Sequence, residues 1–103
     1  AIQLLKDGER NGATLDASAR EVIAEANLPT YPHSLGHAVG LQIHEAPRLT
    51  VKKAERLKPE MVVTIEPGVY IEGAYGIRIE DLMYIKAKDG ELLSKSNKKL
   101  TIL

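Results

Sequence analysis

The chain has 103 residues, enough for one domain or part of one and too few for two independent cores. Lys and Arg together number 14, as do Asp and Glu, so a formal net charge of zero gives no electrostatic reason to expect nucleic acid or an anionic membrane as partner. The absence of cysteine excludes disulfides and thiolate metal sites, and no apolar run approaches the roughly 20 residues of a membrane helix, so the cytoplasm is the default location.

The first quarter of the chain is predicted to be helical. Residues 1–6 are typical of a helix already under way, and Gly8 is a plausible stop. This segment is either a short first helix without a cap or the tail of a helix in a chain cut from a longer protein. Asn11-Gly12 indicates a turn, and a second, amphipathic helix is expected over 16–26 with Asp16 as its N-cap. Its apolar positions follow the spacing i, i+3, i+4, i+7: Ala19, Val22, Ile23 and Ala26.

The remainder of the chain is predicted to form strands. Short β-branched or alternating runs separated by turn residues are typical of an antiparallel sheet. Because helices come first and strands follow, the fold class is predicted to be α+β. The expected strands are Met61–Ile65, Val69–Ile71, Gly76–Lys86, Glu91–Ser94 and Lys99–Leu103, with turns at Pro67-Gly68 and Asp89-Gly90.

All three histidines fall within twelve positions, at His33, His37 and His44. Gly36 and Gly40 bracket the segment, so a loop running into a strand is more consistent with it than a helix. On spacing alone, such a cluster is more often hydrogen-bonded structure than a metal site, and both interpretations stay open.

Two carboxylates are placed by the predicted strands, one after a strand and one within a strand. Glu66 comes directly after a run that should be buried, where a carboxylate needs a cation, although a strand-end Glu can also point into solvent. Glu80 lies in Gly76-Ile-Arg78-Ile-Glu80-Asp81, two residues after Arg78 on the same predicted face. The two could form a surface ion pair, or Glu80 could bind a metal while Arg78 orients a ligand.

Three motifs in order carry a resemblance to a known family: His33-Ser-Leu-Gly-His37-Ala-Val-Gly-Leu-Gln-Ile-His44-Glu45-Ala-Pro, Thr64-Ile-Glu66-Pro-Gly68 and Gly76-Ile-Arg78-Ile-Glu80-Asp81. Together they resemble the pita-bread metallopeptidases, which include Xaa-Pro dipeptidase (prolidase), aminopeptidase P and methionine aminopeptidase. The resemblance covers nearly the whole chain. It implies half of a pita-bread fold, with helices packed on a curved antiparallel sheet. Residues 1–103 would then be the C-terminal part of a catalytic domain whose first half, with the N-terminal domain, is absent.

The resemblance also implies a role for each motif residue. The family holds two divalent ions (Mn, Co, Zn or Fe, depending on the member) with two Asp, one His and two Glu. The matching positions here are His37, Glu66 and Glu80 for the metals; His44, Glu66 and His33 for catalysis; and Arg48, Arg78 and His44 for the substrate. The reaction implied is hydrolysis by a metal-bridging hydroxide, with Glu66 taking the proton of the attacking water.

The motif Ile-Arg78-Ile-Glu80-Asp81, with an Arg before the last Glu, resembles that of the Xaa-Pro branch rather than that of the methionine aminopeptidases. Arg48 resembles an Arg that receives the free carboxylate of a dipeptide, or it is a surface Arg. Nothing in the chain matches the motif of the two Asp ligands, so the site is a partial set and the chain alone is expected to be inactive.

Two other functions remain as alternatives. Relatives of the same fold that lost their ligands are non-catalytic peptide-binding modules, which retention of His37, Glu66 and Glu80 argues against. A self-contained small metal-binding protein is the second alternative. The expected partner is a proline-containing dipeptide or peptide, without nucleic acid or membrane. A half-fold should leave apolar surface uncovered, so self-association, such as a homodimer, is also predicted.

Overall fold

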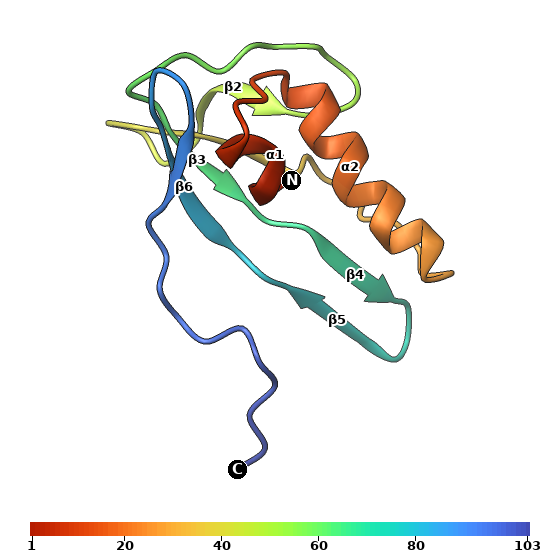
Figure 1. The fold of residues 1–103 in the computed structure, drawn as a ribbon. Helices are drawn as coiled ribbons and strands as arrows, with labels where there is room; N and C mark the ends of the chain where they lie inside the picture. Colours follow the sequence, from red (N-terminus) through yellow and green to blue (C-terminus); the bar gives the residue numbers. More distant parts are fainter.

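Two helices precede seven strands in the computed structural model, which describes residues 1–103 (Figure 1). The helices are α1 (Ile2–Lys6) and α2 (Gly12–Glu25). The strands are β1 (Gly36–Val39), β2 (Glu45–Leu49), β3 (Val62–Ile65), β4 (Gly68–Ile71), β5 (Tyr75–Arg78), β6 (Asp81–Ile85) and β7 (Gly90–Leu92). This order confirms the predicted α+β class. Neither helix has the length and apolar character that crossing a membrane requires.

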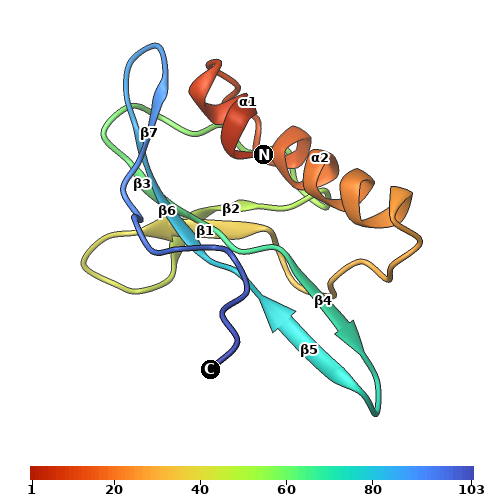
Figure 2. The ribbon, with the colours of Figure 1, turned by 60° about the horizontal axis from the view of Figure 1, so that its bottom comes forward.

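The strands form two antiparallel sheets. Five strands make the main sheet in the order β2-β1-β3-β6-β7, and β4 pairs with β5 in a two-stranded ribbon. Both helices lie over one face of the main sheet, and the ribbon points away from them (Figure 2). The opposite face of the main sheet therefore has no helical layer.

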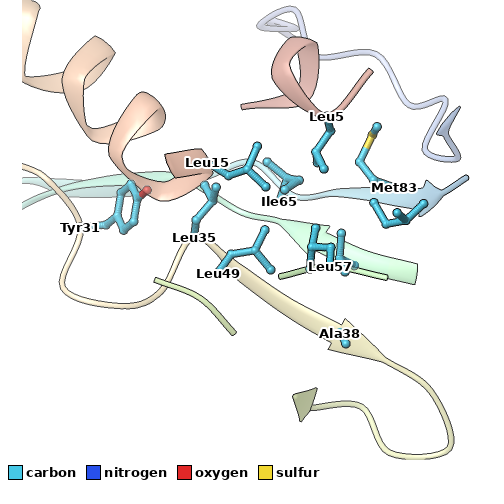
Figure 3. Close-up of a cluster of buried hydrophobic side chains, with 11 residues drawn as sticks. Leu5, Leu15, Tyr31, Leu35, Ala38, Leu49, Leu57, Ile65 and Met83 are labelled. Carbon is cyan, nitrogen blue, oxygen red and sulfur yellow. The ribbon is translucent and has the colours of Figure 1, made fainter. Parts of the chain in front are cut away.

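The hydrophobic core lies between the helices and the main sheet. Leu5 of α1 and Leu15 of α2 meet the central strands, to which Val63 and Met83 contribute (Figure 3). All four side chains are fully buried. Burying side chains of this size stabilises the fold by about 1.5–3 kcal/mol each. The core thus fixes the central strand pair that carries the candidate site.

The predicted strand Gly76–Lys86 is wrong as a single element. Strand β3 pairs with β6, and β4 pairs with β5 in a continuation of the same register. The ladder between these two pairs is interrupted at residues 66–67 and 79–80. Ile77 is 53% exposed and Ile79 is 42% exposed, whereas Met83 is fully buried. The reason is that β5 lies in the ribbon outside the helical layer, so the alternating pattern continues where no core covers it.

The start of the second helix also differs from the prediction. Asn11 is the N-cap, because its side chain accepts a hydrogen bond from the amide of Ala13, so Asn11-Gly12 is not an independent turn. Asp16 is not a cap: it lies one turn into α2 and is fully buried. Gly8 has φ of +98°, in the left-handed region that favours glycine, and ends α1 as predicted.

The C-terminal segment is only partly as predicted. Strand β7 confirms an edge strand after the Asp89-Gly90 turn, which the amide of Lys86 closes by donating to the carbonyl of Asp89. Residues 99–103 form no strand, which corrects the expectation for Lys99–Leu103. The tail leaves the sheet (Figure 1), so its backbone meets no strand edge with which to pair.

A buried arginine ties the N-terminal helices to the far edge of the sheet. The guanidinium of Arg10 donates to the carbonyls of Leu5, Glu9, Lys86 and Asp89, at 2.8–3.2 Å. Its side chain is 7% exposed. Hydrogen bonds from a charged donor to buried acceptors are among the strong ones, so this residue fastens α1 to the turn between β6 and β7.

Replacing Arg10 with Met should lower the free energy of unfolding by roughly 2–4 kcal/mol, because four hydrogen bonds from a buried guanidinium to backbone carbonyls are lost. Denaturant unfolding followed by circular dichroism measures the change. Arg56→Met is the matched control: Arg56 is exposed and forms no ion pair, so its loss should cost less than about 0.5 kcal/mol. Equal stability of the two variants would contradict the assigned role of Arg10.

Candidate metal centre

The position of His37 is set by a close approach of two strands. A Cβ atom added to Gly36 would lie 1.8 Å from the carbonyl oxygen of Thr64, so only glycine lets β1 approach β3 this closely. His37 follows at once and is 7% exposed. The segment forms a strand rather than a helix, as its glycines predicted, and it brings one histidine to the centre of the sheet.

His37, Thr64 and Glu66 form a closed polar network. The amide of His37 donates to Oγ1 of Thr64 at 3.0 Å, and this hydroxyl donates to Oε1 of Glu66 at 2.8 Å. The same carboxylate oxygen lies 3.2 Å from Nε2 of His37. Thr64 thus holds the histidine backbone and the carboxylate in one arrangement. The sequence motif contained Thr64, but no role was predicted for it.

The tautomer of His37 follows from its second contact. Nδ1 lies 3.0 Å from the carbonyl oxygen of Ala38. A carbonyl oxygen only accepts, so Nδ1 carries a proton, and Nε2 is the ring atom that faces Glu66. This donor set fits a divalent ion, since imidazole nitrogen and carboxylate oxygen are ordinary ligands of Zn, Mn and Fe.

Glu80 lies across the strand interruption from Glu66. The shared register of the β3–β6 and β4–β5 ladders places the two residues opposite each other on neighbouring strands. Both line one cavity of about 440 Å³, together with His37 and His44. Carboxylates directly opposite each other in a sheet are destabilising without a cation.

The structure brings two of the three predicted ligands into contact. His37 and Glu66 meet, whereas Glu80 stays on the exposed part of the shared cavity. No group of three His, Asp or Glu side chains is gathered closely enough to hold a metal ion. The metal role of His37, Glu66 and Glu80 therefore stays a prediction.

Arg78 faces Glu66 rather than Glu80. Its Nε lies 3.8 Å from Oε2 of Glu66, and no ion pair joins Arg78 to Glu80. The surface-pair interpretation of Arg78 and Glu80 is therefore wrong. The break between β5 and β6 separates the two residues, so the face that they would share in one continuous strand does not exist.

The other two histidines border the pair from the loop side. The ring of His44 lies 4.5 Å from that of His37, at the exposed end of the β1–β2 connection. His33 stacks on Tyr31 at 4.9 Å and its Nε2 lies 2.7 Å from the hydroxyl of Tyr70. His33 and His44 line a polar hollow of about 170 Å³ with His37 and Glu66. All three histidines that the sequence singled out therefore line this one hollow.

Arg48 lines the same polar hollow. It pairs with His37 in the β1–β2 register, and residues directly opposite in an antiparallel pair point to the same face. Arg48 is exposed, and its guanidinium forms no ion pair. A free cation therefore stands one strand away from the His37–Glu66 contact.

A buried carboxylate supports the loop that carries His33. Asp16 accepts from the Tyr31 hydroxyl at 2.6 Å, from Nε of Arg20 at 3.0 Å and from the amide of Val51 at 2.8 Å. Burial, then the hydrogen bond to Asp16, raises the pKa of Tyr31 well above its usual range. Arg20 also donates to the carbonyl of His33. Sequence reasoning gave Asp16 a capping role and missed this network, because its partners are far apart along the chain.

Comparison with known proteins gives one consistent family. The model of metallopeptidase family M24 matches residues 1–87. The chain is 44% identical over 101 residues to the Xaa-Pro dipeptidase of Pyrococcus furiosus, an alignment that covers 97% of the chain and 29% of that protein. The chain thus spans less than a third of the length of the curated relatives that it matches.

Solved structures agree with this match. The Xaa-Pro dipeptidase of Bacillus anthracis superposes with a TM-score of 0.87 at 40% identity, over 99% of this chain and 30% of that one. An X-prolyl aminopeptidase of Caenorhabditis elegans, described as a cytosolic enzyme with a di-nuclear active site, gives a TM-score of 0.72 at 29% identity, over 90% of this chain and 18% of that one. The fold is accordingly part of a pita-bread fold, and this chain belongs to metallopeptidase family M24.

Proposed function

We propose that residues 1–103 are the C-terminal part of the catalytic domain of an exopeptidase that hydrolyses Xaa-Pro bonds, as a prolidase or an aminopeptidase P. The observation that carries this proposal is the contact of His37 with Glu66, opposite Glu80 at the interruption of the β3–β6 hairpin. Likeness to Xaa-Pro dipeptidases along nearly the whole chain supports it.

The cofactor that this proposal requires is a pair of divalent ions, such as Mn, Co, Zn or Fe. His37, Glu66 and Glu80 would hold them, and when bound the ions supply Lewis-acid activation of water and of the scissile carbonyl. Two further Asp ligands would come from the part of the relatives that this chain does not cover. Asp16 cannot replace them, because its oxygens already accept three hydrogen bonds. The chain alone should therefore be inactive.

The chain's own side chains would divide the remaining work. Glu66, held by Thr64 and Arg78, takes the proton of the attacking water. His44, exposed beside His37, donates a hydrogen bond to the carbonyl oxygen as negative charge develops on it. His33 lines the pocket on its loop side.

Arg48 would orient the substrate by its free carboxylate. It lines the polar hollow with no acidic partner, and a guanidinium is the usual fork-shaped partner of a carboxylate. This contact would place the prolyl residue on the β2 side of the His37–Glu66 pair. The substrate class would then be dipeptides and peptides with proline in the second position.

Location and assembly are part of the same proposal. The likeness to an aminopeptidase described as cytosolic supports a cytoplasmic protein. The isolated chain should self-associate, because large apolar side chains remain exposed on it, among them Leu41, Ile43, Leu100 and Leu103.

Removing any of the proposed ligands should abolish hydrolysis in the full-length protein. His37→Ala, Glu66→Gln and Glu80→Gln should each lower kcat/KM for Met-Pro by more than about a hundredfold, since the Lewis-acid contribution is several kcal/mol. Metal content by mass spectrometry should fall in parallel. Glu72→Gln is the control: Glu72 is an exposed carboxylate in the turn of the same ribbon.

Two results would count against the peptidase. Wild-type activity in the Glu66 and Glu80 variants would refute their role as ligands. A full-length protein that binds Met-Pro peptides and never cleaves them would instead support the non-catalytic peptide-binding module.

Thr64 should behave as a positioning residue. Thr64→Val keeps the shape but removes the hydroxyl, so the buried amide of His37 loses its acceptor and the free energy of unfolding should fall by about 1–3 kcal/mol. The Mn²⁺ concentration that gives half-maximal activity should rise about 10–100-fold. Thr64→Ser should restore most of the metal affinity; a destabilised Val variant with unchanged metal dependence would show a purely structural role.

Arg48→Met should raise KM for Met-Pro by about 10–100-fold with little change in kcat, because one charge-assisted hydrogen bond to the substrate is lost. Met-Pro-amide, which lacks the carboxylate, should be cleaved equally by both proteins. Steady-state kinetics with Arg56→Met as the control make the comparison. An equal loss on both substrates would rule out carboxylate recognition by Arg48.

A further inference from the structure

A larger cavity adjoins the candidate metal centre at the β2 edge of the sheet. It has a volume of about 540 Å³ and shares His33, Ser34 and Arg48 with the polar hollow that contains His37 and Glu66. Its other walls come from α2, the loop before β1 and the segment after β2. The full lining is Arg20, Tyr31, Pro32, His33, Ser34, Arg48, Thr50, Val51 and Lys52.

The charge of this cavity is one-sided. Its lining includes three cationic side chains and no acidic one. Arg20 is already neutralised by Asp16, and its remaining nitrogens donate to the carbonyls of Tyr31 and His33. Arg48 and Lys52 have no acidic partner for their side chains. The cavity therefore presents two uncompensated positive charges, which favour an anionic group.

Lys53, the neighbouring lysine, differs from Lys52 because it has an acidic partner and does not line the cavity. Nζ of Lys53 lies 2.9 Å from Oε1 of Glu55, and Lys53 does not line the cavity. Glu55 uses its other oxygen to accept from the amide of Arg48. Glu55 is thus engaged by Lys53 and Arg48, and Lys52 has no acidic partner. Adjacent lysines, one paired and one free over a cavity, provide a matched pair for experiment.

The length of a peptide residue explains how Arg48 and Lys52 could bind the C-terminal carboxylates of substrates of different length. Under the proposed function, the prolyl residue lies beside Arg48, with the reacting bond at His37 and Glu66. One further residue of an extended peptide adds about 3.3–3.6 Å, which carries its carboxylate past Arg48 into the larger cavity. The exposed Lys52 supplies the other free cation that lines this cavity.

We infer that Lys52 is a specificity residue that receives the C-terminal carboxylate of a Xaa-Pro-Xaa tripeptide. The enzyme would then accept dipeptides through Arg48 and tripeptides through Lys52. This inference rests on the proposed function and assigns a residue to the recognition of its longer substrates.

The test uses the full-length protein and three substrates, Met-Pro, Met-Pro-Ala and Met-Pro-Ala-amide. Lys52→Met should lower kcat/KM for Met-Pro-Ala about tenfold through KM, because a charge-assisted hydrogen bond is lost. Met-Pro and Met-Pro-Ala-amide should be cleaved as by the unsubstituted protein. Lys52→Arg should restore tripeptide cleavage, and Lys53→Met should leave all three substrates unaffected.

The outcomes separate the two proposals. If the unsubstituted protein cleaves Met-Pro and Lys52→Met does not discriminate Met-Pro-Ala from its amide, the role of Lys52 is refuted and the peptidase stands. The role of Lys52 is equally refuted if Met-Pro-Ala is not cleaved, or if Lys53→Met has the larger effect. If none of the three substrates is cleaved, the proposed function fails and the inference with it.

Discussion

The site depends on one physical constraint, the close approach of β1 to β3 at Gly36. This approach lets the Thr64 hydroxyl accept from the amide of His37 while it donates to Glu66. The imidazole nitrogen and the carboxylate oxygen are thereby held 3.2 Å apart. A largely buried carboxylate is costly unless a cation lies beside it. The fold holds this pair in place through hydrogen bonds that a backbone amide and a hydroxyl supply.

The interruption of the long hairpin serves the same end. A continuous ladder would pair the backbone at positions 66 and 80 and present both side chains on a flat sheet face. Instead the ladder stops at this level, the ribbon β4–β5 points away from the helices, and both carboxylates open onto a cavity. The exposed apolar residues of the ribbon, such as Ile77, lie outside the core for the same reason.

Outside the site, two buried charged side chains connect distant segments. Arg10 joins α1 to the turn before β7, and Asp16 joins α2 to the loop before β1 and to the segment after β2. The second network places the His33 loop against the cavity that Lys52 lines. Charge thus changes along the surface, from carboxylates at the hairpin break to free cations at the β2 edge. Under the proposed function, the C-terminal carboxylate of a substrate would lie toward these free cations.

Much of the fold and the candidate residues of the site could be predicted from the sequence. Glycine and proline spacing indicated a strand at His37, β-branched runs indicated β3 and β4, and three motifs indicated the family. Local patterns suffice for these features because they reflect backbone preferences and burial of near neighbours. The N-cap at Asn11, the break at residues 79–80 and the unpaired tail were not predicted. Each depends on what a distant segment covers or leaves open.

The roles of side chains divide in the same way. The sequence by itself determined which functional side chains are available: three histidines, two motif carboxylates and two arginines. Only the tertiary structure decided that Glu66 contacts His37 and Arg78, that Thr64 links them, and that Lys52 is free while Lys53 is paired. Pairing energies depend on distances between atoms that lie far apart in the chain, and spacing along one strand does not encode them.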